Sequence, residues 1–169
     1  MESGGNARVA APPRADGSGK RRGQGAQKQV SELRLEDDGY CFACGVRNPI
    51  GLKLTFETLP GDRLRTIWTP RPEHTGFQDI VHGGLVATVL DEVMIRLLYS
   101  LGIRAVTAEI KTRLLKPLHS GRAYRFESRL VEDKGRIVTT EADGYDTESG
   151  ERVTSGRATC VRVKQAKAG

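Results

Sequence analysis

The sequence has few cysteines and no long apolar run. Its 169 residues include three cysteines, an odd number that does not describe a disulfide framework. No stretch reaches the roughly 18 apolar residues that a membrane-spanning helix needs. Residues 1–30 contain arginines but lack the apolar core of a signal peptide. We therefore expect a soluble, cytoplasmic protein with no membrane partner.

Bulky apolar side chains are almost absent from residues 1–30, which hold six glycines. Six basic residues against two acidic ones give this segment most of the formal net charge of +6. Such a composition cannot bury enough apolar surface to fold, so we predict a disordered basic tail over residues 1–30 and one domain over residues 31–169. Basic runs are usually solvated, and no aromatic residues interleave with this one, so no nucleic-acid partner is expected.

A nearly continuous apolar segment predicts one long central helix. It follows His82-Gly83-Gly84 and ends at Gly102. Apolar side chains occupy nearly every angular position, so the helix should be buried on most sides, and its only charged residues are Asp91, Glu92 and Arg96. Glu92 lies four residues before Arg96, which is the favourable spacing for an ion pair.

Asp91 has no such basic partner. Small residues precede it on the same face, and apolar residues follow it, so a carboxylate lies beside a narrow apolar slot. In a water-poor site a carboxylate can act as a general base or a nucleophile, and the helix N-terminus favours developing negative charge. The residue types alone leave a structural role, in which Asp91 bonds a buried hydroxyl or backbone group, equally open.

His82-Gly83-Gly84 followed by Asp91 on an apolar helix resembles the signature of hotdog-fold acyl-CoA thioesterases of the phenylacetic-acid-degradation (PaaI-like) type. The resemblance runs from about residue 40 to the end and includes Cys41–Gly45, Asn48–Leu52, Gly76-Phe77, Val106–Ile110 and Leu115–Pro117. It implies an α+β hotdog fold, in which an antiparallel β-sheet wraps around one long central helix. Members of this family are dimers or tetramers with sites between subunits, so we expect a homodimer or homotetramer.

The strand pattern agrees with this fold independently. Alternation and turn residues predict a hairpin over residues 52–68, and then strands over 103–118, 121–131, 136–145 and 152–163. A nearly all-apolar helix needs such a sheet around it. In the strand after the helix, alternation places Val106, Ala108 and Ile110 on one face and Thr107, Glu109 and Lys111 on the other.

The resemblance also implies roles for individual residues. The thioester carbonyl would lie against the backbone N–H groups of Gly84 and Gly83, and Asp91 would activate water or attack the carbonyl itself. Thr107 matches a Ser or Thr that the neighbouring subunit contributes to hold the water, although alternation places it opposite Val106. We expect His82 to position the loop and not to transfer a proton.

The implied substrate is an acyl-CoA whose acyl group is small, of medium chain length or aromatic. Its phosphates could meet basic residues after the helix, for which we name Lys111, Arg113 and Lys116. Coenzyme A is part of the substrate, and neither a further cofactor nor a metal is expected.

The pair Cys41-x-x-Cys44 raises the alternative of a zinc site. Two more ligands would have to come from His74, His82, His119 or Cys160, and the sequence has no second CxxC or HxxxH pair. A single CxxC is a weak metal signal, so a packing role for the two cysteines is favoured.

Three other function classes fit the sequence to different degrees. A serine hydrolase of the α/β type is excluded because no G-x-S-x-G motif occurs. A non-catalytic acyl-CoA-binding hotdog domain, acting as a sensor or regulator, stays open as the main alternative. A hydratase or dehydratase is also compatible with the fold. Those enzymes typically use a histidine within the helix, and this helix has none.

Overall fold

The computed structural model describes residues 35–163, so the disorder predicted for residues 1–30 lies outside the described residues. The chain first forms β1 (Glu57–Leu59), β2 (Arg63–Trp68), the 3-10 turn η1 (Pro72–His74), β3 (Thr75–Phe77) and β4 (Ile80–Val81). The helix α2 (Gly83–Ser100) follows, and then β5 (Ala105–Leu114), β6 (Tyr124–Asp133), β7 (Ile137–Asp146) and β8 (Arg152–Arg162). The predicted order of hairpin, helix and meander is confirmed.

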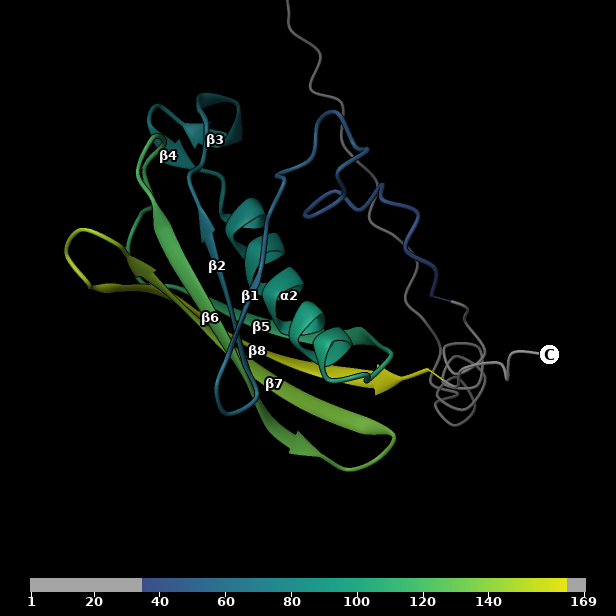
Figure 1. Cartoon of the computed structure of the whole chain (residues 1–169). Helices are drawn as coiled ribbons and strands as arrows, with labels where there is room; N and C mark the ends of the chain where they lie inside the picture. The colour runs from purple at the N-terminus through teal and green to yellow at the C-terminus, as the bar shows by residue number, and fades with distance from the viewer. Residues whose placement is uncertain (1–34, 164–169) are drawn as a thin grey trace, which may run out of the picture.

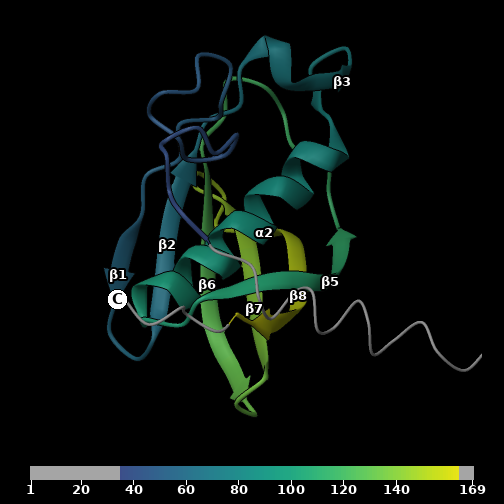
Figure 2. The ribbon, with the colours of Figure 1, turned by 90° about the vertical axis from the view of Figure 1, so that its right-hand side faces the viewer.

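Six strands form one antiparallel sheet in the order β1-β2-β6-β7-β8-β5, and β3 pairs with β4 separately. The sheet curves around α2, which lies along its concave face (Figures 1 and 2). Within residues 35–163 β5 forms a ladder with β8 only, so its other edge has no strand partner in the described part of the chain. This edge strand lies beside the helix, and it carries Thr107, which contacts Asp91 of the helix.

The core forms between α2 and the sheet. Val89, Leu90, Val93 and Met94 are fully buried, and they pack with Phe126 and other sheet residues. Ser128 of β6 adds a hydrogen bond to the Val93 carbonyl oxygen, at 2.9 Å. The helix ends at Ser100, and Gly102 lies just beyond it with a φ of 74°, a conformation that glycine adopts without strain. No helix in the described part of the chain has the length and apolarity that a membrane span requires.

Several strand boundaries differ from the prediction, and two of these differences change the local structure. Residues 52–56 alternate like a strand, but β1 begins only at Glu57. The N–H groups of Leu52 and Leu54 instead donate to the Phe42 and Ala43 carbonyl oxygens, both at 2.9 Å. The segment therefore pairs with a preceding loop. The strand predicted over 103–118 ends at Leu114, and the following segment crosses to β6.

Candidate active site

The loop before α2 is held by two histidines. The His82 N–H donates to the His74 carbonyl oxygen at 2.9 Å, and His82 adopts the extended conformation typical of an N-cap. Its imidazole Nδ1 accepts the Gly84 N–H at 3.0 Å. A Cβ at Gly76 would lie 3.2 Å from the His82 ring, so β3 approaches this ring closely. His82 therefore caps the helix, and its role in positioning the loop for catalysis stays a prediction.

The capping leaves one N–H group of the first helical turn available. The N–H groups of Leu85 and Val86 donate to the His82 carbonyl oxygen, at 2.9 and 3.3 Å, and that of Gly84 donates to His82 Nδ1. Among residues 35–163, no acceptor takes the Gly83 N–H. The two predicted oxyanion donors are therefore not equivalent. The Gly83 N–H is free to bind a ligand, whereas the Gly84 N–H already donates to the capping histidine.

His74 also stabilises this loop. It is buried, its ring lies 5.6 Å from the Trp68 ring between centroids, and its Nδ1 accepts the Arg71 N–H at 3.0 Å. Burial, together with the positive charge of Arg71, lowers the pKa of His74 below the usual histidine range. The neutral ring is thereby favoured, and it packs as a structural element.

Asp91 lies on the side of α2 that faces β5. The Thr107 hydroxyl donates to Asp91 Oδ1 at 2.7 Å, and both side chains are half-buried. The structure thus brings together two residues that sequence analysis named as catalytic candidates. Thr107 and Asp91 belong to the same chain, whereas the resemblance had implied that the neighbouring subunit contributes the threonine.

A β-bulge explains why simple alternation placed Thr107 on the wrong face. The β5–β8 register shifts between Thr107, which pairs with Cys160, and Glu109, which pairs with Thr159. The extra residue, Ala108, is exposed and has no ladder partner. Because of this extra residue, the alternation before the bulge is opposite to the alternation after it. Thr107 therefore faces the helix, as the buried Ala105 does.

Cys160 lies behind this pair but is not a competing nucleophile. It is fully buried on β8, opposite Thr107. Burial, and to a smaller extent the nearby Asp91 carboxylate, raises the pKa of Cys160 to about 11. The neutral thiol therefore dominates at physiological pH, and thiols react as nucleophiles mainly in the thiolate form.

An apolar cavity of about 510 Å³ opens at the N-terminal end of α2. The β3–β4 hairpin, the helix start and the segment after β5 form its walls, and the lining residues are Gly76, Phe77, Ile80, Val81, His82, Gly83, Val86 and Leu114–Leu118. Phe77 is 79% exposed and Leu114 is 53% exposed. Large exposed apolar side chains around a cavity are typical of a surface that receives a ligand or a partner.

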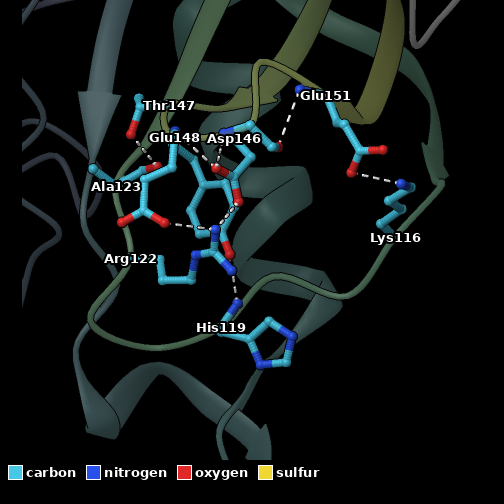
Figure 3. A network of polar contacts seen from close by, with 10 residues as sticks. Lys116, His119, Arg122, Ala123, Asp146, Thr147, Glu148 and Glu151 are labelled. Atoms are coloured by element: carbon cyan, nitrogen blue, oxygen red, sulfur yellow. Dashed lines mark hydrogen bonds and ion pairs between the residues drawn. The ribbon is translucent and has the colours of Figure 1, made fainter.

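The three predicted basic contacts lie in two places. Lys116 lines the apolar cavity, and its ammonium group lies 2.6 Å from the Glu151 carboxylate (Figure 3). Lys111 and Arg113 instead line a polar hollow of about 380 Å³ with sheet residues that include Arg129 and Glu141. In this chain the structure therefore brings Lys116 to the cavity and leaves Lys111 and Arg113 elsewhere. A phosphate-binding role stays a prediction for all three.

A polar network fixes the segment that carries Lys116. Arg122 lies 2.9 Å from both Asp146 and Glu148, and the Thr147 hydroxyl donates to the Ala123 carbonyl oxygen (Figure 3). The Gly121 N–H also donates to the Pro70 carbonyl oxygen at 2.7 Å. These contacts hold the connection between β5 and β6 against the β7–β8 turn, so one wall of the cavity is well defined.

The ion pair predicted between Glu92 and Arg96 is not formed. Arg96 lies 3.3 Å from Asp37, and its guanidinium lies over the Phe56 and Tyr99 rings. Glu92 instead accepts a hydrogen bond from the Cys41 thiol at 3.6 Å. Sequence spacing could not reveal this, because the loop that carries Cys41 is 51 residues away.

Residues 78–153 match the family model of the thioesterase superfamily, from the loop before α2 into β8. A solved structure described as a thioesterase superfamily protein covers 81% of this chain and 72% of its own, with a TM-score of 0.69 at 22% identity. The chain has the hotdog fold. The predicted fold class and the resemblance are thereby confirmed.

Other structures with the hotdog fold carry more specific descriptions. The PaaI protein from the phenylacetic acid degradation operon of E. coli is 14% identical, with a TM-score of 0.63 over 68% of this chain and 83% of that one. A hypothetical thioesterase from Streptococcus pneumoniae TIGR4, solved with coenzyme A, is 17% identical, with a TM-score of 0.62 over 68% of this chain and 88% of that one.

Two further structures are single mutants of a hypothetical thioesterase from S. pneumoniae TIGR4. One replaces an aspartate with alanine and the other replaces a threonine with alanine, and the two mutated positions are 16 residues apart. No curated protein matches this chain significantly by sequence. At these identities the likeness establishes the fold, and activity has to be argued from the site.

Proposed function

We propose that the protein is an acyl-CoA thioesterase, and that Asp91 acts as its general base or nucleophile. The observation that carries this proposal is the 2.7 Å hydrogen bond from Thr107 to Asp91, at the free edge strand of the sheet. A hydroxyl that holds one carboxylate oxygen orients the other toward a reactant. The S. pneumoniae mutants support the assignment, because their aspartate and threonine are separated by the same 16 residues as Asp91 and Thr107.

The proposed reaction needs no group beyond water and the substrate. Asp91 takes a proton from water, and the hydroxide adds to the thioester carbonyl carbon. The Gly83 N–H donates to the oxyanion at the helix N-terminus, where the helix dipole favours negative charge. The carbon–sulfur bond then breaks, and coenzyme A leaves as a thiol with the returned proton. In the alternative route, the Asp91 carboxylate adds to the carbonyl carbon, and the carbon–sulfur bond breaks to release coenzyme A and leave an anhydride. Water then hydrolyses the anhydride to the free acid and restores Asp91.

The spacing of these groups favours a site that is shared between two chains. Gly83 and Asp91 are eight residues apart on one helix, which corresponds to a rise of about 12 Å. A single carbonyl must lie within about 3 Å of its oxyanion donor and equally close to the attacking group. One helix cannot provide both, so the Gly83 of one subunit would serve the Asp91 of another.

The unpaired edge of β5 offers a route to this assembly. Exposed edges pair readily, and a second copy of β5 would extend the sheet across a two-fold axis. Thr107 lies on this strand, and Leu114 at its end contacts Gly83, where a Cβ would lie 2.7 Å from the leucine Cδ1. We therefore propose a homodimer, with a tetramer as a further assembly of such dimers.

The cavity suggests the acyl class. Its lining is mainly apolar, and its volume of about 510 Å³ suits a short, medium-chain or aromatic acyl group. Lys116 is the basic residue at its mouth, so it is our candidate for contact with the polar part of coenzyme A. The S. pneumoniae neighbour solved with coenzyme A supports this class of ligand.

The experiment is a panel of short, medium-chain and aromatic acyl-CoAs, in which release of free thiol is measured for the wild type and for Asp91→Asn. Loss of a general base or nucleophile should lower kcat about a hundredfold or more. Glu132→Gln, at an exposed carboxylate that pairs with Lys134, is the matched control and should keep full activity. If no acyl-CoA is hydrolysed but one raises the melting temperature, the protein is instead an acyl-CoA-binding module.

A further inference from the structure

Three potential metal ligands meet on the side of α2 that faces the N-terminal loop. The Cys41 and Cys44 sulfurs and a Glu92 carboxylate oxygen all lie within 4.8 Å of one another. All three side chains are half-buried. The cysteines come from the loop before β1, drawn in blue in Figure 1, while Glu92 belongs to the helix. The reaction proposed above uses none of them.

Glu92 forms no ion pair with a basic side chain among residues 35–163. Its expected partner, Arg96, pairs with Asp37 and lies over aromatic rings. The carboxylate instead accepts a hydrogen bond from the Cys41 thiol. A bound cation would supply the positive charge that this half-buried carboxylate does not receive from a side chain in the described part of the protein.

The loop presents the cysteines in a fixed geometry. The Gly45 N–H donates to the Cys41 carbonyl oxygen at 2.8 Å, and a Cβ on Gly45 would lie 2.5 Å from backbone atoms of the loop. Lys53 donates to the Gly45 and Val46 carbonyl oxygens, at 3.0 and 2.9 Å. A loop that is held this firmly presents its two sulfurs without an ordering cost at the moment of binding.

We propose that Cys41, Cys44 and Glu92 bind one zinc ion, with water as the fourth ligand. Zinc takes sulfur at about 2.3 Å and carboxylate oxygen at about 2.0–2.2 Å in a tetrahedron, so its ligand atoms lie about 3.5–3.8 Å apart. The 3.6 Å between the Cys41 sulfur and the Glu92 oxygen matches this separation. The remaining pairs lie within 4.8 Å, so zinc binding would require only small side-chain rotations to reach the same range. The helix thus supplies the ligand that the CxxC sequence lacked.

The ion would cross-link the N-terminal loop to the central helix. Metal bonds of this kind contribute directly to folding free energy, because the unfolded chain does not hold the ligands together. The site is separate from the reaction, since Asp91 faces β5 while Glu92 faces the loop. We therefore assign it a structural role.

The test is metal content and cobalt spectroscopy on the full chain, purified under reducing conditions with added zinc. The wild type should hold about one zinc per chain, and cobalt should give thiolate-to-metal charge-transfer absorption with the strong visible bands of a tetrahedral site. Cys41→Ser and Glu92→Gln should each lower the metal content several-fold. Cys160→Ala, which removes the third cysteine of the chain, should leave it unchanged.

Two results would overturn the proposal. The first is a wild type that takes up no more zinc or cobalt than Cys41→Ser under the same conditions. The second is a Cys41–Cys44 disulfide in the untreated protein, two mass units lighter than the dithiol, together with no metal uptake after reduction; the pair would then be a redox couple. If Cys41→Ser does not fold, cobalt titration of the wild type and of the isosteric Glu92→Gln decides the matter.

Discussion

Thr107 on β5 donates a hydrogen bond to Asp91 on α2, at 2.7 Å. The bond joins the middle of the central helix to an edge strand of the sheet, beside the β-bulge at Ala108 that turns this hydroxyl toward the helix. In the proposed mechanism it holds one oxygen of the carboxylate and leaves the other for a reactant.

Thr107→Val keeps the shape of the side chain and removes the donor. A hydrogen bond to a charged group contributes about 1.5–3 kcal/mol, so we expect kcat to fall about tenfold to a hundredfold with a smaller change in KM. Thr107→Ser keeps the hydroxyl and should retain most of the activity. Steady-state kinetics on the best acyl-CoA of the panel measure both, and equal losses in the two variants would contradict the assignment.

Gly83→Pro removes a single backbone donor without breaking the helix. Proline is well accepted at the first helical position, and His82, with φ −62° and ψ 124°, already has the conformation that precedes proline. Losing an oxyanion donor should lower kcat about a hundredfold to a thousandfold. Gly83→Ala is the control, because it creates the same contact with Leu114 but keeps the N–H. The assignment fails if the two variants lose activity equally.

Subunit sharing predicts complementation between two inactive variants. Asp91→Asn and Gly83→Pro damage different halves of a shared site, so a mixed dimer has one intact site and one doubly defective site. Equal amounts of the two, unfolded and refolded together, should recover about a quarter of the wild-type activity by random assortment. Each variant refolded alone should stay inactive. No recovery, despite mixed dimers being detected by mass, would place both groups in one subunit.

The lowered pKa of His74 predicts that stability falls in mild acid. The folded state holds this ring neutral, whereas the unfolded chain binds a proton near the ordinary histidine pKa of about 6.5. The stabilisation is therefore complete above about pH 6.5 and is lost as the pH falls toward the lower folded-state pKa. Urea unfolding at several pH values should show this slope in the wild type and in His119→Gln. In His74→Gln the slope should be weaker, and an unchanged slope would assign the effect to another group.

The overall architecture could be predicted because its signals are local. The apolar run from Leu85 to Leu101 has the composition of a buried helix, and glycine marks its end. The strands of the meander show their alternation directly. His82-Gly83-Gly84 and Asp91 lie in one short segment, so their joint presence also needs no knowledge of the tertiary structure.

The details of the site depend on contacts between distant segments. Alternation placed Thr107 on the outer face, because no feature of the sequence indicates the bulge at Ala108. Helical spacing paired Glu92 with Arg96, but a loop 51 residues upstream and Asp37 changed both partners. The two glycines look equivalent in sequence, and only the direction of the His82 ring distinguishes their N–H groups.

Asp91 and Glu92 are consecutive residues on α2, yet they face different parts of the chain. One carboxylate contacts the edge strand, and the other contacts the loop that contains both cysteines of the CxxC pair. Because the two residues share one helix, a change that shifts the helix at Glu92 would also shift Asp91 relative to Thr107. We therefore expect substitutions in the loop to lower the activity from a distance, without contact with the substrate.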